Sequence, residues 1–469
     1  MTALATYRPR LDGLLAELAD AHGVPGAACG VLVGDETEIA TCGITNTATG
    51  VPVTPATLFQ IGSISKLYTA SLVMQAVSAG LISLDEPVRA QLQEFMVADP
   101  AATIEITPRH LLTHTSGIEG DHLVDTGWNA DALARYVATL AGLGQIHPTD
   151  DTYSFCNTGY GVAGRLLEVA TGEHFDRVLR RRLARPLGCR ATLTLPQHAL
   201  LHNVAVGHAH EPGGEAVRQS RWVLTRSNGP MGGIMAPPGE LLAFARMHLD
   251  GGRGPDGVDR LAPAAVDAMQ RPHVDSPMPG EAQALGWTIR SWGDLTCLGQ
   301  DADTFGQRAL LRVVPEKRFA VCVMTNCQTG AALGQQLLGR LASDLLDVPA
   351  DADDVVAQVA RGGTVGPVPP PDAIAALAGT YERLHQRVTV SVSGGRLRLV
   401  TETSGVLQAL GLSECALDVE AVATDRDGRV VAVGTDPVSG DRQIVVFTPP
   451  SPDQPSALHL AGRLHRRTG

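Results

Sequence analysis

Apolar residues in the first three quarters of the chain recur with helical and strand-like spacings in turn. Leu11, Leu14, Leu15 and Leu18 are spaced like one face of an amphipathic helix. Residues 26–35 and 36–44 predict two strands, joined by a hairpin at Gly34-Asp35. The same patterns predict helices at 63–79, 131–143, 157–171, 238–250 and 335–348, and strands at 308–315 and 318–326. Residues 1–347 are therefore expected to form a mixed α/β unit whose sheet takes strands from both of its ends.

The pattern changes near residue 348. Residues 348–372 are rich in Pro, Gly, Ala and Asp, which is the composition of a linker. After it, short stretches alternate between apolar and polar residues and are separated by turn residues such as Gly394-Gly395. Residues 373–469 are therefore expected to form a small antiparallel barrel or sandwich.

Composition excludes several classes of protein. The net charge of −12 over 469 residues repels phosphate backbones, so nucleic acid is not expected as a partner. No run of eighteen apolar residues predicts a membrane span, and the N-terminal residues do not resemble a secretory signal. The eight cysteines are scattered, without the spacing of a metal site, and no metal or cofactor is predicted. We therefore expect a cytoplasmic protein with reduced, mostly buried thiols.

Lysine is rare in this chain. Of the 37 basic residues only two, Lys66 and Lys317, are lysines. Arginine stays protonated in proteins, whereas a buried lysine can lose its proton and act as a base. A lysine kept against this background indicates a position at which a guanidinium group cannot serve.

Lys66 follows Ser63 by three residues at the predicted start of the helix at 63–79. This spacing places both side chains on one helical face, and the helix N-terminus favours the negative charge of an oxyanion. S-x-x-K is a known catalytic signature in which serine is the nucleophile. The alternative is that Ser63 caps the helix and Lys66 is an ordinary surface charge.

The residues around Ser63, FQIGSISKLYTA, resemble the nucleophile segment of the β-lactamase-related serine hydrolases, which include class C β-lactamases, D-alanyl peptidases and esterases. Four further segments follow in the order typical of this family, and together they span roughly residues 10–345: LISLDEPV, LLTHTSGI, YSFCNTGYGVAGRLLEVATG and GQDADTFGQRALLRVVPE. The resemblance implies a penicillin-binding-protein or β-lactamase fold, with a central antiparallel sheet flanked by helices, over residues 1–347. The tail, which ends in HLAGRLHRR, is similar to the lipocalin-like domain that some members carry, here expected at 373–469 after the linker.

The second catalytic motif departs from the family pattern. Phe155-Cys156-Asn157 stands where the family usually has Tyr-x-Asn, so the hydroxyl that moves protons in the family is missing. Tyr153 occupies a position that the family usually fills with a packing aromatic residue. The resemblance implies that Asn157 binds Lys66 or a substrate amide, whereas a structural role would make it the cap of the following helix.

The third motif departs as well. Gln300-Asp301-Ala302 stands where the family usually has Lys- or His-x-Gly, so a cationic or titrating side chain has become a neutral amide. By analogy with the family, the backbone N–H groups of Ser63 and of Asp303 are expected to donate to the oxyanion. Phe155, Tyr153, Gln300, Asp301 and Asp303 are thus candidates for substrate binding, beside the catalytic candidates Ser63, Lys66 and Asn157.

The leading expectation is a serine hydrolase that forms an acyl-enzyme at Ser63 with an ester, amide or thioester. One alternative is an acyltransferase, or a thioesterase of the penicillin-binding-protein type, that releases or cyclises a peptide. Another is a catalytically impaired family member that binds a ligand or partner in the former active-site cleft. The expected partner is a small-molecule or peptide acyl substrate, joined by a carrier protein if the enzyme works in a biosynthetic pathway.

Overall fold

An antiparallel sheet organises the first part of the chain. The computed structural model describes residues 3–210, 216–352, 365–409, 415–425, 427–437, 440, 442–450 and 456–469. Within these ranges the first sheet has the strand order β2 (Glu36–Gly43), β1 (Gly26–Val33), β12 (Phe319–Thr325), β11 (Gln307–Val314), β10 (Leu295–Thr304), β9 (Thr288–Trp292), β8 (Ala282–Gln283) and β7 (Val274–Asp275). The β1–β2 hairpin pairs with β12. This confirms that strands from both ends of the unit share one sheet.

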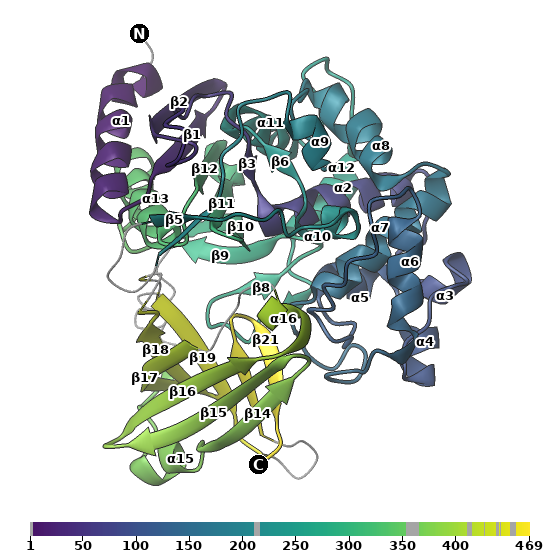
Figure 1. The fold of residues 1–469 in the computed structure, drawn as a ribbon, viewed down its shortest axis with the longest axis vertical. Helices are drawn as coiled ribbons and strands as arrows, with labels where there is room; N and C mark the ends of the chain where they lie inside the picture. Colours follow the sequence, from purple (N-terminus) through teal and green to yellow (C-terminus); the bar gives the residue numbers. More distant parts are fainter. Residues whose placement is uncertain are drawn as a thin grey trace.

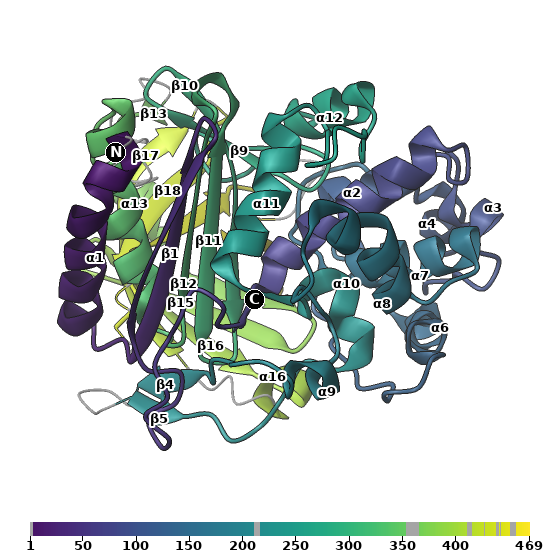
Figure 2. The ribbon, with the colours of Figure 1, turned by 90° about the horizontal axis from the view of Figure 1, so that it is seen from above.

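Helices cover both faces of this sheet (Figure 1, Figure 2). On one face, α1 (Ala3–Ala21) and α13 (Gly330–Leu346) bury leucines such as Leu11, Leu15 and Leu337. On the other face, α11 (Pro238–Leu249) and α2 (Ser65–Ser78) share a larger apolar core with the sheet. β1 is covered on both sides, which explains why its residues are almost all apolar or small instead of alternating.

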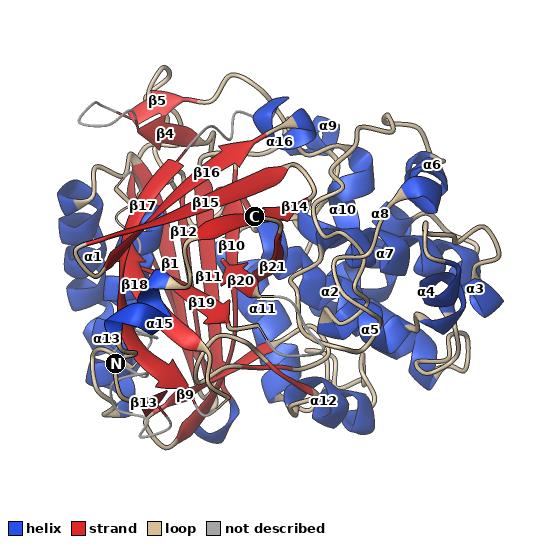
Figure 3. Cartoon of the chain, turned by 90° about the horizontal axis from the view of Figure 1, so that it is seen from below, coloured by secondary structure: helices blue, strands red, loops and turns tan. Residues whose placement is uncertain are grey.

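A helical region extends from the second face (Figure 3). It contains α3 (Val88–Gln91), α4 (Pro100–Glu105), α5 (Pro108–Thr113), α6 (Ala132–Ala138), α7 (Asn157–Thr171), α8 (Phe175–Val178), α9 (Pro196–Ala199), α10 (Gly229–Gly232) and α12 (Pro263–Gln270). The predicted helices at 63–79, 157–171 and 238–250 are confirmed as α2, α7 and α11. None of the helices that the structure describes is both long and apolar enough to cross a membrane.

The C-terminal part of the chain is a closed barrel. Its strands are β14 (Gly379–Arg383), β15 (Gln386–Ser393), β16 (Arg396–Thr403), β17 (Cys415–Asp425), β18 (Val430–Thr435), β19 (Arg442–Thr448), β20 (Ala457–Leu460) and β21 (Arg463–Arg467). Each strand pairs antiparallel with the next one along the chain, and β21 pairs with β14 to close the barrel. Alternate side chains, such as those of Leu397 and Leu399, fill its interior. The predicted antiparallel β domain is thus confirmed as a barrel.

The segment predicted as a linker is only partly described. Residues 353–364 lie outside the described residues. Val365–Gly366 form the short strand β13, which pairs with the end of β17, and α15 (Pro371–Ala375) precedes β14. The chain therefore joins the barrel's sheet before residue 373.

The barrel is seated on the α/β unit through the β20–β21 hairpin. The Phe155 N–H donates to the carbonyl of Gly462 over 2.9 Å, and the Leu464 N–H donates to Ser154 Oγ over 3.2 Å. The turn between the strands is Ala461-Gly462, and both residues have positive φ angles of 50° and 71°. Two such residues are typical of the tight hairpin turn whose twist matches the flanking strands. The turn places Arg463, the first residue of β21, beside the segment that carries the second motif.

Candidate active site

Ser63 lies in a single 3-10 turn, Gly62–Ile64, that leads directly into α2. The turn needs glycine at position 62, because its φ angle is +45° and an added Cβ would lie 3.0 Å from the Cβ of Ala302. β10 carries Ala302, so this contact fixes the third motif against the nucleophile. Ser63 is half-buried, and the first turn of the helix gives its N–H no partner within the helix.

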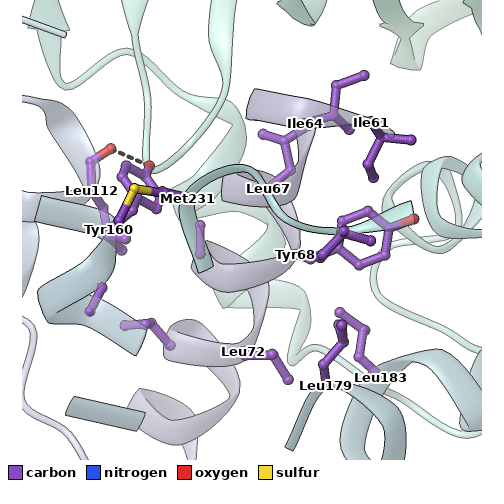
Figure 4. Close-up of a cluster of buried hydrophobic side chains, with 14 of the residues drawn as sticks. Ile61, Ile64, Leu67, Tyr68, Leu72, Leu112, Tyr160, Leu179, Leu183 and Met231 are labelled. Atoms are coloured by element: carbon purple, nitrogen blue, oxygen red, sulfur yellow. Dashed lines mark hydrogen bonds between the residues drawn. The ribbon is translucent and has the colours of Figure 1, made fainter. Parts of the chain in front are cut away.

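Apolar packing holds α2 in place. Figure 4 shows the side chains that surround it, which come from α2 itself, from the turn before it and from neighbouring helices: Ile61, Ile64, Leu67, Tyr68, Leu72, Leu112, Tyr160, Leu179, Leu183 and Met231. The hydroxyl of Tyr160 donates to the Leu112 carbonyl over 3.0 Å. The N-terminus of α2 is thus held rigidly, as a preorganised catalytic group requires.

Lys66 is completely buried and reaches Ser63. Its Nζ lies 3.0 Å from Ser63 Oγ and donates to the Met231 carbonyl over 2.8 Å. Burial, together with the positive charge of Arg463, lowers the pKa of Lys66 to about 7. At neutral pH a large share of the lysine is therefore an uncharged amine, which can accept the Ser63 proton while it donates to Met231.

Phe155, the residue expected at the position of the family's tyrosine, lies next to this lysine. Lys66 Nζ lies 4.6 Å from the centre of the Phe155 ring, and the guanidinium carbon of Arg463 lies at the same distance from it. The ring also stacks on His114, with ring centres 4.7 Å apart. Phe155 thus presents an apolar ring to both charged groups, and it carries no group that could move a proton.

Asn157 points to a buried carboxylate. Its Nδ2 donates to Asp121 Oδ1 over 2.7 Å, and the same carboxylate accepts from Arg463 Nε over 2.8 Å and pairs with Arg383 at 2.9 Å. No contact with Lys66 is among those described for Asn157. The helix α7 is capped by Cys156, whose sulfur accepts from the Gly159 N–H, and not by Asn157.

Asp121 is the centre of this polar cluster. Burial would raise the pKa of its carboxyl, but Arg463 and Arg383 hold that pKa well below its usual range, so the carboxylate is charged. The cluster joins residues from four places in the chain: the segment after α5, the start of α7 and the barrel strands β14 and β21. Its two arginines and one carboxylate leave a net positive charge near Lys66.

The third motif lies along the end of β10. β9 pairs with β10 only as far as Gly299, so the edge of residues 300–304 is open toward the turn that holds Ser63. Gln300 is buried, with its side chain turned back to the carbonyl of Asp301. The Asp301 carboxylate pairs with Arg312 and Arg290. Of these two candidates, neither has a described contact with Ser63 or Lys66.

The Asp303 backbone faces the nucleophile. Its carbonyl oxygen lies 3.5 Å from the Cβ position of Gly62, on the open edge of β10. Within a strand the N–H and C=O of one residue point to the same edge, so the Asp303 N–H is also directed toward the Ser63 turn. The Asp303 side chain instead pairs with Arg308 on β11, at 3.2 Å.

Tyr153 is buried behind the second motif. Its ring meets His114 edge-on at 5.6 Å, and its carbonyl contacts His459 Nε2 of the barrel at 3.1 Å. Burial raises the pKa of its hydroxyl, which keeps the group neutral. No hydrogen bond from this hydroxyl to Lys66 or Ser63 is described, so its observed contacts are those of a packing residue.

Four residues of the site were not identified from the sequence: Asp121, Met231, Arg383 and Arg463. Asp121 lies three residues after the end of the LLTHTSGI segment, and Met231 meets Lys66 through its backbone carbonyl, which side-chain patterns do not reveal. Arg463 follows an Ala-Gly pair between two alternating stretches, a hairpin signal that fixes its place on a strand but not the surface that it faces.

The sequence of the α/β unit matches a known family. Residues 11–345 match the family described as Beta-lactamase. Among characterised proteins, penicillin-binding protein 4 of Amycolatopsis lactamdurans is 40% identical over 385 residues, which cover 81% of this chain and 97% of that protein.

Solved structures extend the likeness to the whole chain. The crystal structure of SurE superimposes with a TM-score of 0.74 and 26% sequence identity, covering 100% of both chains. A second structure, of SurE with D-Leu, gives a TM-score of 0.72. A class C β-lactamase from Rhodobacter sphaeroides shares the fold over 68% of this chain and 93% of its own, with a TM-score of 0.56 and 21% identity.

Proposed function

Because the chain belongs to the β-lactamase family of serine hydrolases and penicillin-binding proteins, we propose that it forms an acyl-enzyme at Ser63 and passes the acyl group to an acceptor. The observation that carries this proposal is the contact of 3.0 Å between Ser63 Oγ and a buried lysine whose pKa is lowered to about 7. A serine next to a neutral amine at a helix start is an activated nucleophile.

In the acylation step, Ser63 Oγ attacks the carbonyl carbon of an ester, amide or thioester. Lys66 takes the Ser63 proton, and the carbonyl oxygen becomes an oxyanion that the N–H groups of Ser63 and Asp303 stabilise. Lys66 then returns the proton to the leaving alcohol, amine or thiol as the bond between it and the carbonyl carbon breaks. Atoms and charge balance without a cofactor.

The fate of the acyl-enzyme depends on which group activates the acceptor. A hydrolase needs a base placed at a water molecule, and in this chain Phe155 and Gln300 stand where the family has titrating side chains. Lys66 is the one titratable side chain that the described residues bring within hydrogen-bonding distance of Ser63. We therefore favour transfer to an amine or alcohol held next to Ser63, whose proximity can outweigh bulk water. The likeness to SurE over the full chain, and the SurE structure with D-Leu, support a substrate or acceptor that contains a D-amino acid.

The test is the pre-steady-state release of nitrophenol from an activated ester. We expect a burst equal to the enzyme concentration, followed by slow turnover that an added amine such as a D-amino-acid ester accelerates. Ser63→Ala should abolish the burst, and intact-protein mass spectrometry should find the acyl adduct on wild type only. Ser391→Ala, in the barrel, is the control that should leave both unchanged.

Two other outcomes would redirect the assignment. Rapid turnover without a burst, insensitive to added amines, would identify an ordinary hydrolase. An absence of acylation by every activated ester and fluorophosphonate tried would favour a binding protein that no longer catalyses.

A further inference from the structure

Arg463 is a charged residue that the barrel delivers to the active site. It begins β21, directly after the tight Ala461-Gly462 turn, and its side chain is 24% exposed. The hairpin that carries it is fixed to the second motif by the Phe155 N–H to Gly462 carbonyl bond. The position of Arg463 is thus set by backbone contacts on both sides of it, since the Leu464 N–H also donates to Ser154 Oγ.

The ion pair with Asp121 fixes the guanidinium group over Phe155. Arg463 Nε donates to Asp121 Oδ2 over 2.8 Å, and its guanidinium carbon lies 4.6 Å from the Phe155 ring centre. Lys66 Nζ lies at the same distance from that centre. Two groups at that distance from one ring centre can be no farther apart than twice 4.6 Å. Lys66 is buried and the Arg463 side chain is three-quarters buried, so the two charges act on each other with weaker screening than in bulk water.

The other charged or titratable groups that act on Lys66 are few. The Asp121 carboxylate favours the protonated lysine, whereas burial raises the pKa of the Cys156 thiol to about 11 and keeps that group uncharged at neutral pH. His114 senses the lysine's charge, and burial followed by that charge lowers the pKa of His114 well below its usual value, so it stays neutral. Arg383 neutralises part of the Asp121 charge but is not among the groups on the Phe155 ring. Arg463 is therefore the cation that opposes protonation of Lys66 most directly.

We propose, on the basis of the proposed function, that Arg463 is a positioning residue for the general base: its charge beside the Phe155 ring adds to the effect of burial and favours the neutral form of Lys66, so that the barrel completes the active site when its hairpin is docked. The two altered motifs leave the lysine without a titrating neighbour from the family pattern. In this chain the barrel supplies the electrostatic partner in their place.

The scarcity of lysine allows a direct measurement. Protein labelled with ¹³C at lysine Cε gives one signal from Lys66 and one from Lys317, which is exposed and serves as an internal reference. We expect the Lys66 titration midpoint to rise by about one pH unit in Arg463→Gln, because a cation that opposed protonation is gone. Arg463→Lys keeps the charge and should titrate like wild type.

A matched control separates charge from anchoring. Arg383→Gln also removes a barrel arginine from Asp121, but that arginine does not lie on the Phe155 ring. It should move the midpoint less than Arg463→Gln does. Equal shifts in the two variants, or no shift in Arg463→Gln, would show that Arg463 only anchors the barrel and would overturn the proposal.

A second neutral variant covers the case in which Arg463→Gln does not fold. Arg463→Met keeps an unbranched side chain against the ring, and a normal thermal melt with an unshifted Lys66 midpoint would equally overturn the proposal. The titration needs no substrate. A wild-type protein that never acylates, but shows the Lys66 shift, would refute the proposed function and leave the electrostatic role of Arg463 standing.

Discussion

At the scale of single residues, the protonation state of Lys66 determines whether the site can activate Ser63. Its side chain is buried without a carboxylate in contact, and its described partners are a hydroxyl and a carbonyl. A permanently charged group would be costly in that position, whereas a neutral amine fits it. Arginine stands at nearly every other basic position of this chain, and the burial of this position explains why it carries lysine instead.

Lys66→Arg is therefore expected to slow acylation by about 10²–10⁴-fold, because a guanidinium group keeps its proton. In wild type the burst rate should rise with pH and reach half its maximum near pH 7, because the lysine must lose its proton to act and burial lowers its pKa to about 7. Burst rates between pH 5 and 9 measure both effects. Lys317→Arg, at an exposed position, is the control and should match wild type. A Lys66→Arg enzyme with near-normal rates would mean that the lysine is not the base.

For the second and third motifs we predict a gain: substitutions there should speed hydrolysis of the acyl-enzyme. Phe155→Tyr combined with Gln300→His restores a hydroxyl and a titrating ring, and should raise hydrolytic turnover after the burst by at least about tenfold, as expected of an added general base. The burst amplitude should stay the same, because acylation already has Lys66. Unchanged turnover would indicate that the introduced hydroxyl and imidazole do not reach the attacking water molecule.

At the scale of elements, the nucleophile depends on how the Ser63 turn meets β10. Gly62 has a φ angle of +45°, and a Cβ added there would lie 3.0 Å from the Cβ of Ala302. Gly62→Ala should lower the free energy of unfolding by about 2–4 kcal/mol, from the left-handed backbone and from the overlap of two methyl groups.

Ala302→Gly, combined with Gly62→Ala, should recover part of that loss, and urea unfolding of the two single variants and the double variant measures the coupling. Strict additivity of the two changes would mean that the methyl groups do not meet. The loss that remains in the double variant has two sources. One is the strained backbone at position 62, and the other is the contact of the added Cβ with Thr304 Cγ2 at 2.9 Å.

Local pattern predicted the elements well and the polar network poorly. The helix at Ser63, the β1–β2 hairpin, the strands at 308–315 and 318–326 and the antiparallel tail all follow from periodicity, which is a property of neighbouring residues. Arg463 meets Asp121 and Phe155 only because β21 folds back onto the second motif. No spacing in the sequence encodes that contact. Asn157 illustrates the limit, because its family role and a helix cap were both plausible, and the structure pairs it with a carboxylate that neither considered.

At the scale of the whole molecule, the barrel is joined to the α/β unit by polar contacts more than by a shared core. The large apolar clusters of the α/β unit hold almost none of the barrel's residues, and the barrel's interior forms a cluster of its own. Across the interface lie the Asp121 ion pairs, the hairpin hydrogen bonds and a small apolar patch of Met278 against Val431, Ile444 and Val446. Such an interface positions a domain without being needed for the fold of its neighbour.

A chain ending at residue 352 should therefore fold, because it keeps Val348 and Ala352 in the core beneath α13. It should still label at Ser63, but more slowly at neutral pH. Loss of the barrel removes Arg463 and Arg383 from Asp121 and admits water to Phe155 and Lys66, and each change favours the protonated lysine. A rise of one unit in the pKa of Lys66 would make acylation about fivefold slower at pH 7, and the difference should vanish at high pH. This prediction is tested by the fluorophosphonate labelling rates of the short and full chains across pH, together with thermal melts of both. Identical rates at every pH would mean that the barrel does not influence acylation at Ser63. A short chain that cannot be obtained in folded form would mean that the two parts form one cooperative unit.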